Sequence, residues 1–210
     1  TIQNPAATPS TATTYTVVGT DSNGCSATDS VNVSLNGLTI ATTASATTIC
    51  AGNSSNLSVS GATSYVWTPA GSLSNATSAN PVATPTTTTT YTVIGNDATS
   101  GCADTTTITI TVNGLPTVNA GATLLICAGA TANLSATGAT NYLWTPTTSL
   151  NNPNIPNPTS TATATTLYTV TGTDLNGCSA SDTVSVIVTP VPTANAGNNT
   201  SICLGSSTTL

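Results

Sequence analysis

The chain has 210 residues and contains no Lys, Arg, His, Glu, Met or Phe, so its six Asp residues set a net charge of −6. Binding to nucleic acid depends on Lys and Arg that neutralise phosphates, and attraction to anionic membrane surfaces depends on the same side chains. The composition therefore excludes both partners. Membrane insertion is also excluded, because no apolar run approaches the roughly 20 residues that a spanning helix needs.

Self-similarity dominates the chain. Four motifs recur: Ile-Cys, Tyr-x-Trp-Thr-Pro, Tyr-Thr-Val and Gly-Cys, with successive copies 76 or 77 residues apart. The copies begin at Ile49, Ile126 and Ile202; at Tyr65 and Tyr142; at Tyr15, Tyr91 and Tyr168; and at Gly24, Gly101 and Gly177. A fixed period of this length indicates a tandem-repeat protein.

The phase of the repeat divides the chain into four parts. Residues 1–37 match the C-terminal part of a repeat, 38–114 and 115–190 are complete repeats, and 191–210 match the N-terminal part of a further one. Both ends fall inside predicted strands, so we expect the chain to be a window on a longer array. The junctions between repeats are short and contain no Gly/Ser linker, which favours domains arranged end to end.

Within a repeat the apolar residues have a period of two. Leu57 and Val59 mark one strand, Tyr65 and Trp67 mark a third strand on the same face, and Tyr91 opens the penultimate strand. The last strand follows an Asn/Gly turn and alternates apolar with polar residues, at Val31, Val33 and Leu35, at Ile108, Ile110 and Val112, and at Val184, Val186 and Val188. About seven short strands per repeat predict an all-β protein of immunoglobulin-like antiparallel β-sandwich repeats.

Large aromatic side chains are candidates for the core. A Trp on the third strand of an immunoglobulin-like sandwich packs between the sheets, which places Trp67 and Trp144 in the core rather than in a sugar-binding surface. Tyr15, Tyr91 and Tyr168 stand at the start of the penultimate strand, the position of the tyrosine corner, and are predicted core residues too.

The order of these motifs resembles the immunoglobulin-like and PKD-like repeats of secreted bacterial surface proteins. Such arrays are typical of gliding bacteria and their relatives, which export adhesins through a dedicated outer-membrane system. The resemblance implies a spacer, stalk or adhesive module with no catalytic role. Two features depart from it: the Gly-Asp-Gly turn common after the Trp strand of PKD-like domains is absent, and the cysteines do not occupy the antibody positions.

The six cysteines indicate structural disulfides in an oxidising, extracellular setting. Metal binding needs clustered ligands, and the chain has neither Cys-x-x-Cys nor His. We expect bonds inside single repeats, because the front of a domain and its last hairpin turn are expected to lie at nearby ends of a sandwich. The alternative links neighbouring repeats. The favoured pairs are Cys50–Cys102 and Cys127–Cys178, with Cys25 and Cys203 paired outside the window, and the alternative pairs are Cys25–Cys50 and Cys102–Cys127.

Each repeat also carries two Asp residues that flank the Gly-Cys turn. They are Asp21 and Asp29, Asp97 and Asp104, and Asp174 and Asp182. Asp at hairpin ends commonly caps turn amides, which is the favoured interpretation. A calcium site and a carboxylate pair for glycoside hydrolysis are the alternatives. No cofactor is predicted. Ser and Thr nucleophiles would need a base, and without His or Lys the sequence predicts that the protein is not an enzyme.

The abundance of hydroxyl side chains predicts O-glycosylation, because a nearly uncharged β surface has little electrostatic protection against strand pairing. In the bacteria that the resemblance points to, glycans are placed on Ser or Thr after Asp. That pattern occurs at Ser30, Thr105 and Thr183, which are the candidate sites.

The sequence therefore predicts a non-enzymatic structural repeat of a secreted extracellular fibre, filament or surface stalk. Its expected partners are neighbouring repeats of the same chain, covalent O-glycans and homotypic fibre contacts. The alternatives are an adhesin or glycan-binding module, since the middle segments 70–81 and 147–158 differ most between repeats, and an accessory module of a secreted enzyme.

Overall fold

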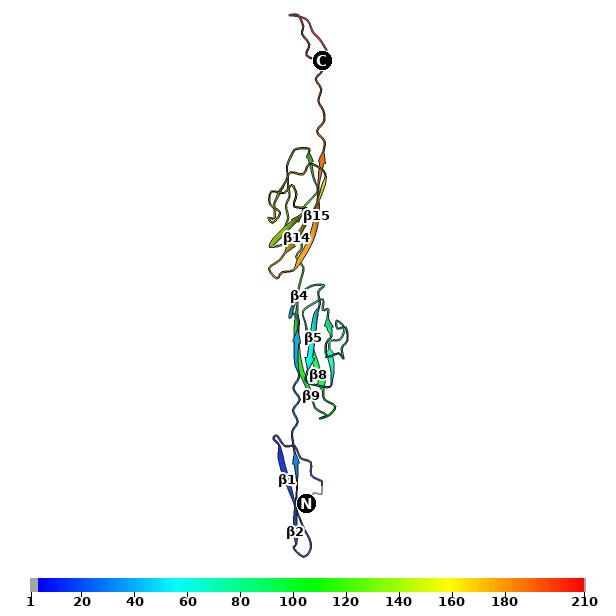
Figure 1. The fold of residues 1–210 in the computed structure, drawn as a ribbon, viewed down its shortest axis with the longest axis vertical. Coiled ribbons are helices and arrows are strands. Elements are labelled where there is room, and N and C mark those ends of the chain that lie inside the picture. Colours follow the sequence, from blue (N-terminus) through cyan, green and yellow to red (C-terminus); the bar gives the residue numbers. More distant parts are fainter. Residues whose placement is uncertain (1–3, 210) are drawn as a thin grey trace. The chain divides into compact units, whose positions relative to one another are not determined.

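The computed structural model of the protein describes residues 4–209. The chain divides into two compact units, Thr1–Val112 and Asn113–Leu210. The regular structure within residues 4–209 is β throughout, and it includes no helix that could cross a membrane. The division falls at Asn113, inside the predicted junction between the two complete repeats. The all-β class predicted from the sequence is confirmed (Figure 1).

The first unit contains one hairpin and one seven-stranded sandwich. The hairpin is β1 (Thr13–Thr20) and β2 (Ser26–Val33), and the sandwich is β3 (Ala41–Ala44), β4 (Thr48–Cys50), β5 (Ser55–Ser60), β6 (Ser64–Thr68), β7 (Val82–Ala83), β8 (Thr89–Asn96) and β9 (Ala103–Asn113). The sandwich has one sheet ordered β4-β9-β8-β6 and a facing sheet ordered β3-β5-β7. Two facing sheets of this kind form an immunoglobulin-like sandwich.

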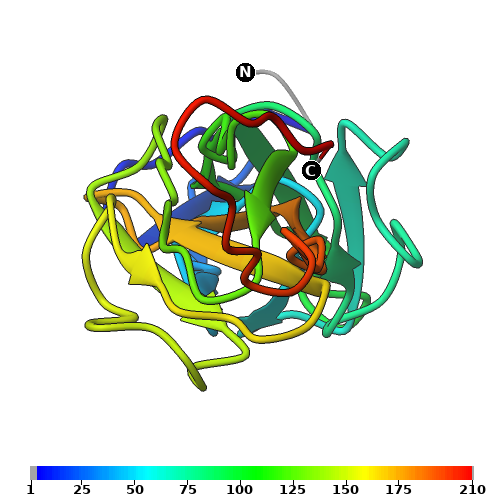
Figure 2. The same cartoon turned by 90° about the horizontal axis from the view of Figure 1, so that it is seen from above.

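The second unit repeats this plan. Its strands are β10 (Leu124–Cys127), β11 (Ala132–Asn133), β12 (Asn141–Thr145), β13 (Thr159–Ser160), β14 (Thr166–Thr173) and β15 (Ser179–Thr189). One sheet is ordered β10-β15-β14-β12, and the other consists of β11 and β13 with an isolated bridge between Asn119 and Thr137 at the place of β3 and β5. Figures 1 and 2 show β14 and β15 side by side. Residues 190–209 form no strand.

The last two strands of each repeat form the predicted antiparallel hairpin. Tyr91 of β8 pairs with Ile108 of β9, and Tyr168 of β14 pairs with Val184 of β15. The same register joins Tyr15 of β1 to Val31 in the first hairpin. The period-two pattern fixes this register, because a slip of one residue would turn every apolar side chain outward.

The core of each sandwich is small and centred on one Trp. Trp67 is 1% exposed and Trp144 is fully buried, and each lies with a fully buried Tyr from the penultimate strand. Leu57 and Val59 were expected on the same face as Tyr65 and Trp67. They instead lie in the opposite sheet, and all four side chains meet in the space between the sheets.

The segment between β6 and β7 closes the open edge of the first sandwich. Its carbonyls at Ala76 and Ser78 accept from the Trp67 backbone N–H and the indole Nε1–H, at 2.8 and 2.9 Å. Further along, the carbonyls of Ala79 and Pro81 accept from Val59 and Leu57 in the facing sheet. One loop thus accepts hydrogen bonds from backbone N–H groups in both sheets, and buried backbone N–H groups require such partners.

The second sandwich uses the same arrangement with different residues. Trp144 donates from its backbone N–H to Pro153 and from its indole to Ile155, at 2.9 and 3.1 Å. Leu134 donates to Pro158 of the same loop. These loops differ most in sequence, yet their backbone contacts are equivalent, since main-chain carbonyls can accept irrespective of the side chain.

One glycine between β5 and β6, and its counterpart between β11 and β12, are required by close backbone approach. Gly61 has φ of +106° and Gly138 has φ of +93°. A Cβ on either residue would collide with a backbone carbonyl, that of Thr39 or Thr117. Glycine is the residue that tolerates both the left-handed backbone and this proximity.

Leu57→Ala should destabilise the first sandwich by about 2–5 kcal/mol, because Leu57 is 1% exposed and its removal leaves a cavity in a small core. Each sandwich has one Trp, so urea unfolding followed by Trp fluorescence should show one of two transitions moving to lower denaturant. Leu134→Ala, at the equivalent buried position, should move the other transition. Val66→Ala is the surface control, since Val66 is 47% exposed, and a change above about 0.5 kcal/mol there would contradict the assigned core.

Candidate functional site

One Asp of each repeat organises the Gly-Cys turn, as the turn-capping interpretation predicts. The Asp21 carboxylate accepts from the backbone N–H groups of Asn23 and Cys25, both at 2.9 Å. Asp174 accepts in the same way from Asn176 and Cys178.

Asp97 makes a variant of the same turn. It accepts from both the backbone and the hydroxyl of Ser100, at 3.0 and 2.6 Å. The hydroxyl bond is the largest cause that lowers the pKa of Asp97, followed by the backbone bond. Hydrogen bonds that favour the charged form have this effect.

The second Asp of a complete repeat has another role, which the sequence did not reveal. Asp104 on β9 accepts from the backbone N–H of Ile40 at 2.9 Å, and Asp182 on β15 accepts from Ala120 at 2.8 Å. Each carboxylate thereby fastens the first segment of its domain to the last strand. The bond from Ile40 or Ala120 is also the largest cause that lowers the pKa of that Asp.

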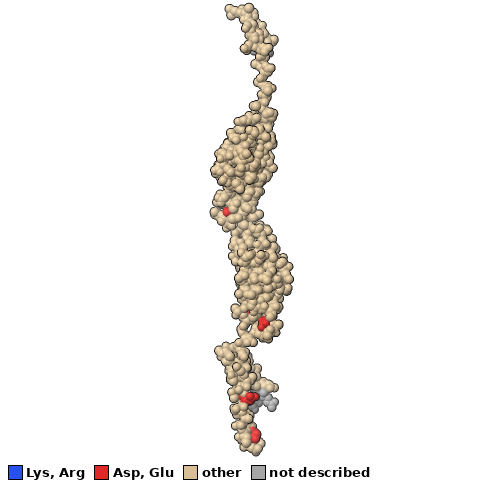
Figure 3. Space-filling view, in the orientation of Figure 1, with Lys and Arg blue, Asp and Glu red and all other residues tan. Residues whose placement is uncertain are grey.

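These six carboxylates do not form a chemical centre. Within residues 4–209 no group of three or more His, Cys, Asp or Glu side chains is placed to hold a metal ion. The few Asp side chains lie apart on the face seen in Figure 3, on a surface without Lys or Arg. The carboxylates bind backbone amides, which is the chemistry of turns and strand ends.

The cysteines differ from the predicted pairing. Cys50 and Cys178 are disulfide-bonded, whereas Cys102 and Cys127 carry free thiols, so the expected Cys50–Cys102 and Cys127–Cys178 bonds are not formed. The alternative pairs, Cys25–Cys50 and Cys102–Cys127, are not formed either, because Cys25 is also free.

The physical reason is the direction of the front strand. β10 runs parallel to β15, with Cys127 beside Thr189 at the end of that strand, while Cys178 directly precedes its first residue, Ser179. The 11 residues of β15 span about 35 Å at roughly 3.3 Å per residue, whereas disulfide Cα atoms lie within about 7 Å. The two cysteines of one repeat therefore lie at opposite ends of its sandwich.

The first sandwich has the same geometry. Thr111, near the end of β9, donates to the carbonyl of Thr47, just before the strand that ends at Cys50. Cys102 directly precedes Ala103, the first residue of β9. A signal in the sequence could have shown this separation. Cys50 follows Leu38 by 12 positions, which is enough extended chain to span the length of a last strand.

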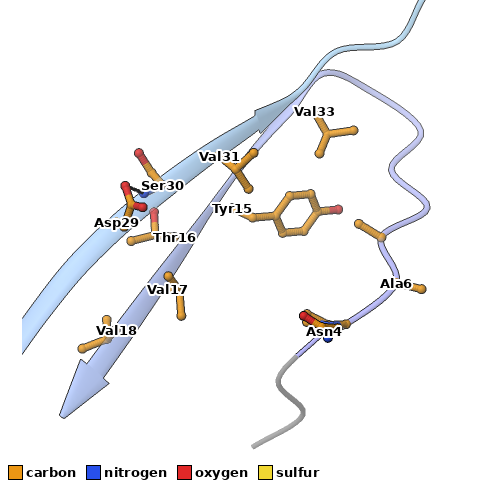
Figure 4. A pocket seen from close by; sticks show the side chains of 12 residues that line it. Asn4, Ala6, Tyr15, Thr16, Val17, Val18, Asp29, Ser30, Val31 and Val33 are labelled. Atoms are coloured by element: carbon orange, nitrogen blue, oxygen red, sulfur yellow. Dashed lines mark hydrogen bonds between the residues drawn. The ribbon is translucent and has the colours of Figure 1, made fainter. Parts of the chain in front are cut away.

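The first hairpin presents an open apolar face. Tyr15, Val17 and Val31 are 39%, 65% and 61% exposed, whereas the equivalent Tyr91 and Val93 are fully buried. The hollow beside this face is about 740 Å³ and is bordered by residues 4–7 (Figure 4). Tyr15 was predicted as a core residue and is instead half-exposed, because within the described residues no second sheet covers β1 and β2.

The Tyr side chains also differ from the predicted tyrosine corner. Tyr91 and Tyr168 bond through their hydroxyls to Ser72 and Ser160, at 2.6 and 2.8 Å. The hydroxyl that returns to the backbone three residues upstream belongs to Tyr65, which donates to the Ala62 carbonyl at 2.8 Å. Tyr142 makes the equivalent bond, and the Gly-Ala-x-x-Tyr spacing shared by both repeats is the signal that marks it.

The three candidate glycosylation sites lie on the last strand of their repeats, where Ser30 and Thr183 are equivalent and Thr105 lies two residues closer to the turn. Ser30, Thr105 and Thr183 are exposed and lie one residue after the second Asp of their repeats. In the ladder they stand opposite Thr16, Ile94 and Thr169. Their hydroxyls are sterically accessible on the outer face of the last strand.

No family model and no curated protein matches this chain. Among solved structures it is similar to three N-terminal domains of the outer capsid protein Hoc of bacteriophage RB49, with 17% identity and a TM-score of 0.38 over 72% of this chain and 59% of that one. It is also similar to extracellular domains 3–5 of Drosophila OTK, with 9% identity and a TM-score of 0.43 over 85% and 71%.

A third similar structure is a Ca²⁺-stabilised adhesin with which an Antarctic bacterium binds ice, at 17% identity and a TM-score of 0.39 over 88% of this chain and 58% of that one. The chain thus spans about three fifths of the capsid protein fragment and of the adhesin. The assignment of an immunoglobulin-like sandwich rests on the strand order of the two sheets.

Asp104→Asn should remove part of the acid sensitivity of the first sandwich. The folded-state pKa of Asp104 is lowered, so the stability it contributes is present above the unfolded value of about 3.9 and is lost as the pH falls through the folded pKa. Urea unfolding between pH 2 and pH 7 should show a smaller loss below about pH 4 for the variant than for the parent.

Asp29→Asn is the matched control, since Asp29 accepts from the adjacent backbone N–H of Ser30 and not from a front segment. It should leave the unfolding of residues 38–113 unchanged at every pH. An unaltered pH dependence in Asp104→Asn would contradict the role assigned to this carboxylate.

Proposed function

We propose that this chain is a non-enzymatic structural part of an extracellular array, which acts as a spacer, stalk or fibre. The observation that carries the proposal is the equivalence of consecutive domains. Both use one buried Trp under a loop, one Asp in the turn and one Asp that fastens the front segment. Each of these groups stabilises the fold, and the complete set is present in both domains.

An extracellular location is supported by the cysteines. Cys50 and Cys178 are disulfide-bonded, and disulfides persist in oxidising compartments. A surface rich in hydroxyls and poor in charge agrees with this location, and secretion to a bacterial cell surface follows from the resemblance of the motifs.

The absence of enzymatic activity is proposed from the side chains available. The chain has no His or Lys to activate a hydroxyl nucleophile, and the carboxylates of Asp104 and Asp182 are engaged by backbone amides. Carboxylates held in this way stay ionised, whereas hydrolysis of glycosides requires one carboxylic acid with a raised pKa.

The adhesin alternative depended on the variable middle loops. In the first domain the backbone carbonyls of this loop, from Ala76 to Pro81, accept hydrogen bonds from the strands at the sandwich edge. Variation there is compatible with a purely architectural role, because the contacts use main-chain carbonyls. The structural role is therefore the function we put forward.

Small-angle X-ray scattering tests the spacer role. A compact 210-residue domain has a radius of gyration of about 17 Å, and sandwiches joined end to end by short junctions should give a value well above it. The scattering should retain the Kratky maximum of folded domains. A radius near the compact value would contradict the proposal, and a Gly/Ser insertion at 113–115 is the control that should broaden the distance distribution.

O-glycosylation is the second testable part. Protein purified from its native host should exceed the polypeptide mass of 20.5 kDa, with sugar on peptides that contain Ser30, Thr105 or Thr183. The physical motive is solubility of an uncharged β surface. The triple change of these residues to Ala should lower the attached mass, and a native mass equal to that of the bare polypeptide would refute the expectation.

A further inference from the structure

We propose that Asn36 is a site of spontaneous covalent modification, at which its side chain reacts with the backbone of Gly37 and is converted to aspartate or isoaspartate. The reaction is an intramolecular amide exchange followed by hydrolysis, so its only co-reactant is water. The site lies in the segment that joins β2 to β3. This inference goes beyond the spacer function and does not depend on it.

The chemistry starts from the backbone nitrogen of Gly37. This nitrogen attacks the Cγ atom of Asn36, a bond forms between the two atoms, and the bond from Cγ to Nδ2 breaks. The Nδ2 group leaves as ammonia and takes the proton that the attacking N–H gives up. Water then opens the cyclic imide. Cleavage of the new bond leaves aspartate, whereas cleavage of the original peptide bond leaves isoaspartate, in which the main chain runs through the side-chain carboxyl.

Asn-Gly is the dipeptide that permits this attack most readily, because glycine has no Cβ to crowd the nitrogen. The chain contains four such pairs, which start at Asn23, Asn36, Asn113 and Asn176. Asn113 is set apart from the comparison, because it is the last residue of β9 and is half-buried. The other three pairs differ in the hydrogen bonds that hold them.

The Asp turns hold two of these pairs in place. Gly24 donates its backbone N–H to the carbonyl of Asp21 at 3.1 Å. Gly177 donates in the same way to the carbonyl of Asp174 at 3.2 Å. The Asn of each pair is fixed too, since its own N–H donates to the carboxylate of the same Asp at 2.9 Å. The attacking nitrogen is therefore engaged, and the turn must open locally before the reaction can begin.

Asn36 lies in a different setting. Residues 34–40 form no strand, and both Asn36 and Gly37 are exposed. The backbone carbonyl of Asn36 accepts from the Cys102 thiol at 3.3 Å, a bond that leaves the next nitrogen free. Within residues 4–209 no hydrogen bond engages the N–H of Gly37. A Cβ on Gly37 would meet no atom within 4 Å, and the same is true of the turn glycines, so the hydrogen bonds make the difference.

The modification changes both the charge and the length of the segment. It adds a carboxylate to a chain with a net charge of −6 and no Lys or Arg to pair with it. Isoaspartate also adds one atom to the main chain. The first anchor of the sandwich comes after this point, where Ile40 donates to Asp104 at 2.9 Å. We therefore expect the sandwich to keep its stability while the segment before it changes.

Peptide mass spectrometry of the ageing protein tests the proposal. The folded chain is incubated at neutral pH, and samples are digested with pepsin at acid pH, where this reaction stops. Loss of the amide is followed in the peptides that contain Asn23, Asn36 and Asn176, which come from one molecule and are controls for one another. Asn36 should react at least about tenfold faster than the other two, the factor expected when one charge-assisted hydrogen bond must first be broken.

Asp21→Ala is the matched variant, because it removes the carboxylate that accepts from Asn23 and leaves the surroundings of Asn36 unchanged. Asn23 should then react faster, while Asn36 keeps its rate. Gly37→Ala should slow the reaction of Asn36 alone, since the added methyl group crowds the attacking nitrogen. In urea, where the turns are lost, the rates of the three pairs in the parent chain should converge.

Equal rates for the three pairs in the folded chain would overturn the proposal, and so would an Asn36 that stays intact while Asn23 or Asn176 reacts. A difference that persists unchanged in urea would contradict it as well, because it would then arise from neighbouring side chains and not from the fold. The scattering of freshly purified protein is independent of the modification, so the spacer function can stand where this inference fails.

Discussion

The parallel course of the front strand and the last strand is the constraint on which the rest of each sandwich depends. β10 pairs with β15 in parallel, so the chain must cross the length of the domain before it reaches the front cysteine, Cys127. The same crossing brings the first segment of the domain to the start of the last strand, where Asp182 accepts from Ala120. The direction of the front strand therefore determines both the Asp contact and the position of the front cysteine.

A small core makes these polar contacts important. Apolar burial in each domain is centred on one Trp and one Tyr, with Ala, Val and Leu around them. The indole of Trp67 and the hydroxyl of Tyr91 are both hydrogen-bonded, to Ser78 and Ser72. A buried polar group without a partner would cost about 1–3 kcal/mol, a large fraction of the stability of a domain this size.

The periodicity of the sequence predicted the strands, their buried faces and the last hairpin. The alternation at Ile108, Ile110 and Val112 located the last strand and its buried face, and the Asn/Gly turn located the hairpin. Trp67 was predicted to be buried, because a large aromatic side chain on the third strand of a sandwich usually packs between the sheets. The contact of Asp104 with Ile40 could not be predicted, because it joins residues 64 positions apart and no local pattern records it.

The errors have a common origin. The predicted cysteine pairing assumed that the front strand ends near the last turn, at the same end of the sandwich. Periodicity shows which face of a strand is buried, but it does not show the direction in which the strand runs. Tyr15 was assigned to a core because its motif matches Tyr91, yet burial depends on a facing sheet and not on the motif. The exposed face of the first hairpin shows the same motif without that sheet.

The parallel pairing also bears on how a single domain responds to force. A pull on its two ends is applied to the front strand and to the last strand, which lie side by side through Leu124 and Val186 to Cys127 and Thr189. Because the strands run in the same direction, their hydrogen bonds are perpendicular to the load and are strained together, whereas an antiparallel pair pulled from one end opens one bond at a time. The domain should therefore yield abruptly, by shear of this strand pair, and not by gradual peeling.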